Sequence, residues 1–157
     1  MIRISFEEVF SAFQDMQKAQ NEPISDHWIE HAKKSIWYKG TVNPSELIVP
    51  YPEFRRLVFY GIRGLTNKEA LEKILNSNNE KAMKMITGPL KNQPPIIVWL
   101  RQDGRYQVDD GCRRSLTACY LGIDRIDAYI AIPGMPEKLD YWKIKPPYTP
   151  EDLRPKK

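Results

Sequence analysis

The sequence predicts a protein of the α+β class, in which helices and strands occupy different segments of one chain. Three patterns support this prediction. Apolar residues recur at helical spacing between Phe6 and Met16. A β-branched and aromatic run at 95–101 is followed by a turn and a second extended segment. Apolar residues alternate with others over 125–132, as in a strand. At 157 residues the chain can bury about two-thirds of its unfolded surface, so we expect one domain, or one domain with an arm.

Composition indicates a soluble protein with a basic surface. Hydrophobic residues make up 41% and charged residues 28% of the chain. Apolar runs are too short to span a bilayer, and the first residues are amphipathic and acidic, unlike a signal peptide. We therefore expect a cytoplasmic protein without a membrane partner. The net charge of +4 favours anionic partners but names none. About 10 Å of helix separates Cys112 from Cys119, which is too far for a disulfide bond within the helix. We therefore interpret them as two thiols in a reducing compartment.

The first forty residues predict two helices. Ser5 and Glu8 form a capping box, and the helix they begin ends near Ala19. Ser25 or Asp26 can cap a second helix, which we expect to end at Gly40. The apolar stripe of this second helix consists of Trp28, Ile29, Ala32 and Ile36. Residues 1–40 are therefore interpreted as an N-terminal helical extension.

The middle of the chain mixes extended and helical segments. Residues 41–52 are punctuated by prolines and predict a short strand or edge segment, whereas 54–62 has no clear period. Leu65, Thr66 and Glu69 indicate a second capping box, so a helix is expected from about Asn67 to Leu75. A further helix is expected around Ala82, Met83 and Ile86, closed by Gly88 and Pro89.

The stretch from Val108 to Ser115 is the centre of the prediction. A strand at 95–101, a turn at Asp103-Gly104 and a return strand at 106–108 form a hairpin that leads into a helix. That helix is expected to stop at Gly122, which can adopt the left-handed conformation. A half-buried strand is expected at 126–132, followed by a proline-rich arm at 133–157 packed on the domain.

This arrangement resembles the ParB/sulfiredoxin superfamily. The segment Val42-Asn43-Pro44-Ser45-Glu46-Leu47 is similar to the family's opening strand, and Pro95-Ile96-Ile97-Val98 to its P-I-x-V strand. Asp110-Gly111-Cys112-Arg113-Arg114 stands where partition ParB proteins have Gly-Glu-Arg-Arg, sulfiredoxins Gly-Cys-His-Arg, and ADP-dependent free serine kinases Asp-Gly-His-His-Arg. Order and spacing match over 41–132. The resemblance implies a small mixed β-sheet with flanking helices over these residues.

The resemblance also implies that nucleotide phosphates bind at the hairpin-to-helix junction. The positions concerned are Gly111, Cys112, Arg113, Arg114 and Ser115. Free backbone N–H groups at a helix start and guanidinium groups are donors suited to phosphate oxygens. ATP, ADP or CTP is therefore the expected ligand, with Mg²⁺ as an optional companion held through water by Asp109 or Asp110.

The members of this superfamily differ in chemistry, and the chain departs from each of them. The 25 residues after Ile132 are too few for the helix-turn-helix region of a full partition ParB. Cys112 stands at the sulfiredoxin cysteine, but Arg113 replaces the adjacent histidine. In the serine-kinase interpretation, Asp110 or Glu53 accepts a proton while the arginines stabilise a transferred phosphoryl group, and we prefer Asp110.

Each candidate also has a simpler interpretation. Asp110 can serve only as a helix cap, and Arg113 and Arg114 can form ordinary surface salt bridges. Cys112 at a helix start beside arginines would be reactive if exposed, but an incidental small residue is at least as good an interpretation. Cys119 is expected in the core.

His27, Glu30 and His31 match the H-x-x-E-H pattern of inverzincin metallopeptidases. Such a short match is common by chance, so we interpret the histidines as surface residues beside an apolar stripe and assign no metal ligand.

Three functions follow from the sequence. The first is a nucleotide-binding protein that hydrolyses or transfers phosphate. The second is a module that binds DNA or RNA without catalysis, or a ParB-like nuclease, supported by the basic balance and by Arg55, Arg56 and Arg63. The third is a sulfiredoxin-type thiol enzyme that uses Cys112.

Overall fold

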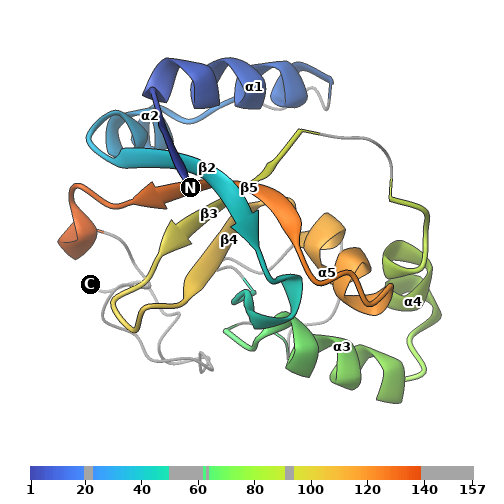
Figure 1. Cartoon of the computed structure of the whole chain (residues 1–157). Helices are drawn as coiled ribbons and strands as arrows, with labels where there is room; N and C mark the ends of the chain where they lie inside the picture. Colours follow the sequence, from blue (N-terminus) through green and yellow to red (C-terminus); the bar gives the residue numbers. More distant parts are fainter. Residues whose placement is uncertain (20–22, 50–61, 63, 91–93, 139–157) are drawn as a thin grey trace, which may run out of the picture.

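The computed structural model describes residues 1–19, 23–49, 62, 64–90 and 94–138. These residues form an α+β fold in which a mixed, open β-sheet lies between two groups of helices (Figure 1). The strands are β1 (Ile2–Ile4), β2 (Ile36–Val42), β3 (Ile96–Leu100), β4 (Tyr106–Asp110) and β5 (Ile126–Ile132). The helices are α1 (Phe6–Ala19), α2 (Asp26–Lys33), α3 (Asn67–Asn76), α4 (Glu80–Ile86) and α5 (Cys112–Tyr120), with short 3₁₀ turns η1 (Pro44–Glu46) and η3 (Pro136–Lys138).

The sheet has the strand order β1-β2-β5-β3-β4. All neighbours are antiparallel except β3 and β5, which run parallel from the pair Ile96–Ala128 to the pair Trp99–Ala131. From β4 the chain crosses through α5 to β5 in the middle of the sheet. The parallel pairing of β3 with β5 requires a crossover of this kind. The expectation of a small mixed sheet with flanking helices is therefore confirmed.

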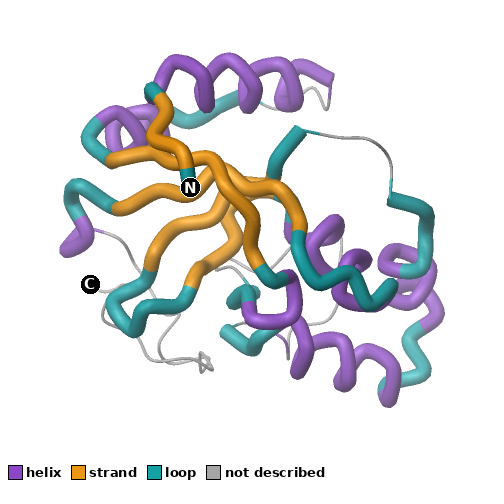
Figure 2. Tube along the Cα trace, in the orientation of Figure 1, coloured by secondary structure: helices purple, strands orange, loops and turns teal. Residues whose placement is uncertain are grey.

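Each face of the sheet has its own apolar core, because helices cover both faces (Figure 2). Helices α3, α4 and α5 pack on the face that carries Ile96, Val98 and Val108. Helices α1 and α2 pack on the face that carries Ile97 and Trp99. On the α1/α2 face, the aromatic rings of Phe6, Phe10, Phe13, Trp28, Trp37 and Trp99 lie within 4.6–6.5 Å of a neighbouring ring centroid.

Because both faces are covered, the central strand differs from its prediction. The expected half-buried strand at 126–132 is wrong in its burial: Ala128, Tyr129, Ile130 and Ala131 are all buried. Its even-numbered residues face one core and its odd-numbered residues face the other. The second face is buried because α1 and α2 pack against it, and the residue pattern of this strand alone does not predict that contact.

The second predicted helix is shorter than expected. Ser25 caps α2 as predicted, but the helix ends at Lys33 and strand β2 begins at Ile36. The prediction of helix up to Gly40 is wrong because Ile36 and the aromatic residues after it pair with β5 along their whole length. Strand β2 also crosses the expected boundary at residue 40, and β1 adds to the same sheet. The first forty residues thus contribute two strands and one helical layer to this sheet.

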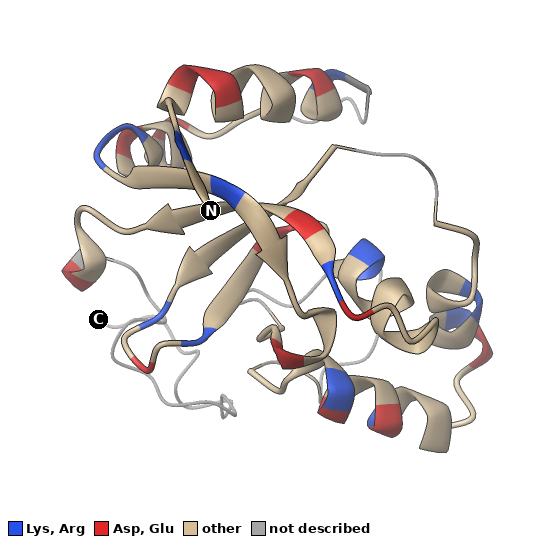
Figure 3. Ribbon diagram, viewed as in Figure 1, with Lys and Arg blue, Asp and Glu red and all other residues tan. Residues whose placement is uncertain are grey.

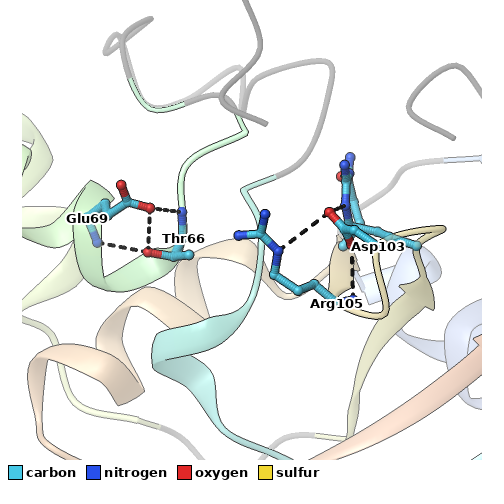
Figure 4. Close-up of polar contacts among 6 residues, drawn as sticks. Thr66, Glu69, Asp103 and Arg105 are labelled. Atoms are coloured by element: carbon cyan, nitrogen blue, oxygen red, sulfur yellow. Dashed lines mark hydrogen bonds and ion pairs between the residues drawn. The ribbon is translucent and has the colours of Figure 1, made fainter. Parts of the chain in front are cut away.

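Local signals in the sequence are reproduced closely. Thr66 and Glu69 form the reciprocal capping box of α3, in which each side chain accepts a hydrogen bond from the other residue's backbone N–H (Figure 4). Gly122 ends α5 with a positive φ of 72°, and Ile123 N–H donates to Ala118 at 3.0 Å, as in a Schellman motif. Helices α1, α4 and α5 also form where they were expected.

The β3–β4 turn is held by charged groups. Asp103 accepts hydrogen bonds from Arg101 Nε at 3.3 Å and from the Arg105 backbone N–H at 3.0 Å (Figure 4). Desolvation raises the pKa of Asp103, but the Arg105 N–H and the charges of Arg101 and Arg105 outweigh it, so the pKa lies below its usual value. Gly104 has a φ of 82°, which confirms the predicted turn.

Candidate functional site

Gly111 joins β4 to α5 and has a left-handed backbone, with φ 97° and ψ 27°. A Cβ at this position would lie 2.9 Å from Ile96 Cβ, closer still to Ile96 Cγ2, and 3.2 Å from Arg114 Nη2. Real Cβ atoms are not found so close to another side chain, so only glycine fits. Glycine is therefore required at this junction because the side chain of Ile96 in strand β3 packs directly against it.

The α5 N-terminus differs from the other described helix starts. Ser5, Ser25, Thr66 and Asn79 each accept a hydrogen bond from a first-turn N–H of their helix. Gly111 has no side chain that could do so, and no side-chain cap is formed. A helix start carries a partial positive charge and N–H groups that lack partners within the helix. The positive end of the α5 dipole is thus not neutralised by a side chain of its own cap residue.

The two predicted arginines have different environments. Arg113 is exposed and makes no hydrogen bond or ion pair within the described part of the chain. Arg114 is largely buried, and its guanidinium donates to the Pro94 carbonyl oxygen. Arg114 Nη2 also lies 3.4 Å from Asp110 Oδ2 and 3.8 Å from Met16 Sδ. Arg113 is therefore available to a ligand, whereas Arg114 connects α5 to β4 and α1.

Asp110, the preferred proton acceptor, forms the ion pair with Arg114. Only 19% of the Asp110 side chain and 15% of the Arg114 side chain is exposed. Desolvation lowers the pKa of Arg114, while the Asp110 charge and hydrogen bond oppose that change. A guanidinium remains charged in any case, so Arg114 keeps its positive charge beside Asp110. Asp110 is not the helix cap, because Gly111 occupies that position.

Cys112 and Ser115 lie beneath the junction rather than at its surface. Cys112 is 3% exposed and belongs to the core on the α3/α4/α5 face. Ser115 is fully buried, and its hydroxyl donates to the Cys112 carbonyl oxygen at 2.8 Å. Neither side chain is placed to contact a ligand at the protein surface. Cys119 is partly exposed, and desolvation raises the pKa of its thiol more than the charge of Lys68 lowers it.

Asn67, which the sequence interpretation treated only as the first residue of a helix, links α3 to the junction. Its side chain is fully buried, and Nδ2 donates to both Pro44 O and Ser115 Oγ, each at 2.9 Å. Its backbone N–H donates to Leu47 O at 2.8 Å. A capping box identifies the residue at this position but does not indicate where its side chain points. No signal in the sequence distinguishes such a buried asparagine from an exposed one.

Asp109 is the extra residue of a β-bulge. Asp110 pairs with Ile97 and Val108 pairs with Val98, so the backbone of Asp109 lies opposite no residue of β3 in the strand pairing. Its Oδ2 accepts hydrogen bonds from the indole N–H groups of Trp28 at 2.5 Å and Trp99 at 2.8 Å. The sequence predicted that Asp109 or Asp110 holds Mg²⁺ through water. In the structure, the Asp109 carboxylate connects α2 to the sheet.

Protein atoms crowd the Asp109 carboxyl group although the residue as a whole is exposed to solvent. Desolvation raises its pKa, and the two indole hydrogen bonds, which favour the charged form, oppose this shift. Because water still reaches the residue, the desolvation is partial.

The two histidines share one helix face but differ in exposure. Their ring centroids are 4.4 Å apart; His27 is exposed, whereas His31 is buried. The interpretation of both as surface residues is therefore wrong for His31, which is 4% exposed. Glu30 lies 4.0 Å from Lys34, in an exposed ion pair. Among the described residues, no group of three His, Cys, Asp or Glu side chains could hold a metal ion.

Several predicted residues lie outside the described part of the chain. Glu53, Arg55, Arg56 and Arg63 are among them, as is most of the proline-rich arm. Over the described part of the chain, basic and acidic residues alternate in short stretches along the ribbon (Figure 3). No described helix has the length and apolar character needed to cross a membrane.

Comparison with protein-family models gives no match to this chain, and comparison with curated proteins gives none either.

Proposed function

We propose that the chain binds the phosphate groups of a nucleotide at the N-terminus of α5. The observation that carries this proposal is the uncapped start of α5 beside the exposed guanidinium of Arg113. First-turn N–H groups and a guanidinium are the two donor types that bind phosphate most strongly. The resemblance of residues 110–114 to the superfamily motif adds the nucleotide as the ligand class.

The direct contacts are assigned to Arg113, which is exposed in the first turn of α5. Arg114 is assigned a supporting role, because Asp110 and Pro94 already occupy its guanidinium. ATP, ADP and CTP are the candidate ligands, with Mg²⁺ as a charge-neutralising partner of their phosphates.

Titration calorimetry with ATP, ADP and CTP, with and without Mg²⁺, tests the proposal. Replacing Arg113 with alanine removes a charge-assisted hydrogen bond worth about 1.5–3 kcal/mol, so the dissociation constant should rise about 10- to 100-fold. Arg125→Ala is the matched control, because Arg125 is also exposed and lies beyond the opposite end of α5, roughly 13 Å along the helix. Absence of binding by all three nucleotides, or equal losses in both variants, contradicts the proposal.

Hydrolysis or transfer of phosphate is the catalytic part of the proposal and needs a proton acceptor. Asp110 is the described carboxylate next to the junction, and its ion pair with Arg114 would have to loosen for it to act. Asp110→Asn should abolish release of phosphate from ATP while binding persists. Turnover equal to that of the unmodified protein would remove Asp110 from this role.

The dependence of affinity on salt concentration separates nucleotide binding from nucleic-acid binding. A protein that neutralises several backbone phosphates loses affinity linearly in log salt with a steep slope. Basic and acidic residues are interspersed along the described ribbon, which gives nucleic-acid binding no specific support (Figure 3). The burial of Cys112 likewise gives none to a thiol enzyme.

A further inference from the structure

We propose that Asn67 is a positioning residue, whose carboxamide holds the first turn of α5 in the geometry that binds phosphate. This inference rests on the proposed function of the α5 N-terminus. It assigns no ligand contact to Asn67, which is fully buried.

Three chain segments meet at the Asn67 side chain. Nδ2 donates to Pro44 O in η1 and to Ser115 Oγ in α5, while Asn67 itself begins α3. The Ser115 hydroxyl in turn donates a hydrogen bond to the Cys112 carbonyl oxygen in the first turn of α5. A chain of buried hydrogen bonds therefore runs from η1 through Asn67 to the turn that carries Arg113.

The asparagine has a cost that packing alone does not explain. Its Oδ1 is buried and has no hydrogen-bond partner among the described residues. An unsatisfied buried acceptor destabilises the fold, and an apolar residue of similar size would avoid that cost. Each buried unsatisfied group calls for a physical reason, and here the reason is the pair of donor bonds that no apolar residue can make.

A missing side-chain cap makes this support necessary. In the other described helices a cap residue fixes the first turn, but α5 begins at Gly111, which contributes no side chain. Glycine also has the greatest backbone freedom. The hydrogen bonds of Asn67 and Ser115 fix the turn from the buried side instead.

The experiment compares two variants in a Cys119→Ser background, in which Cys112 is the remaining thiol. Asn67→Leu removes the donor bonds at similar volume. Ile74→Val is the matched control, because Ile74 is a fully buried residue of the same helix whose truncation costs stability without removing a side-chain hydrogen bond. Cys112 labelling by a thiol reagent reports opening of the first turn, and calorimetry with ATP reports phosphate affinity.

We expect Asn67→Leu to speed Cys112 labelling and to weaken ATP binding about tenfold, because small displacements of positioned groups have effects of this size. Ile74→Val should do neither beyond its effect on the free energy of unfolding. If Asn67→Leu does not fold, Ser115→Ala removes the same link with a smaller change and should show both effects.

Labelling that rises equally in the asparagine variant and the control overturns the inference, since Asn67 would then be only a stability residue. Unchanged ATP affinity in Asn67→Leu, with a loss in Arg113→Ala, overturns it while the proposed function stands. If ATP does not bind the unmodified protein, the proposed function fails, and the labelling comparison still decides whether Asn67 holds the turn.

Discussion

Replacing Gly111 with alanine tests whether the hairpin-to-helix junction requires glycine for steric reasons. Two costs add at this residue. A non-glycine residue with a left-handed backbone costs about 1–2 kcal/mol. The new Cβ would also lie 2.9 Å from Ile96 Cβ, within a packed core, and overpacking costs about 1–3 kcal/mol. The free energy of unfolding should therefore fall by about 2–5 kcal/mol.

Gly122→Ala separates the two costs. Gly122 also has a positive φ, of 72°, but a Cβ there meets no atom within 4 Å. Its loss should stay at about 1–2 kcal/mol. Urea unfolding followed by tryptophan fluorescence measures both variants, and the slope of the transition checks that the denatured states are comparable. A loss at Gly111 no larger than that at Gly122 would refute the steric argument.

Further predictions concern a helix cap and a titrating carboxyl group. Thr66→Ala removes the cap of α3 and should lower the free energy of unfolding by about 1 kcal/mol in urea; no change would mean that the capping box contributes nothing. Asp109→Asn keeps an oxygen for the two indole groups but does not titrate. Because the folded-state pKa of Asp109 is raised, its contribution to stability is full below the unfolded pKa near 4 and is lost as pH rises through the folded pKa. Relative to the unmodified protein, the variant should gain stability from pH 3 to pH 7, and a relative loss over that range would contradict the raised pKa.

Local chemistry explains which elements the sequence predicted. Capping boxes, the Asp103-Gly104 turn and the glycine after α5 depend on residues close in the chain, so their signals survive without tertiary information. Ile36 illustrates the limit. Ile36 fits the helical spacing of the apolar residues in α2, whereas the β-branched and aromatic residues near it favour a strand. Pairing with β5 makes this segment a strand rather than a helix.

The candidate site divides in the same way. The order of strand, glycine and helix could be predicted, and the structure forms it. The difference between Arg113 and Arg114 could not, because it depends on Pro94 and Met16, which approach from distant parts of the chain. The bulge at Asp109 is equally invisible, since it follows from how β4 pairs rather than from its residues.

The central place of β5 has a consequence for the order in which the molecule assembles. Strands β1 and β2 pair with each other, β3 and β4 form a hairpin, and in the described sheet only β5 joins the two pairs. During synthesis these pairs emerge early but remain separate until Ile126–Ile132 leaves the ribosome. Folding then depends on contacts distant in sequence, which makes closure of the sheet the slow step. Until then the unpaired edges of both strand pairs are exposed and can pair with other chains, so the nascent chain is prone to aggregate until β5 closes the sheet.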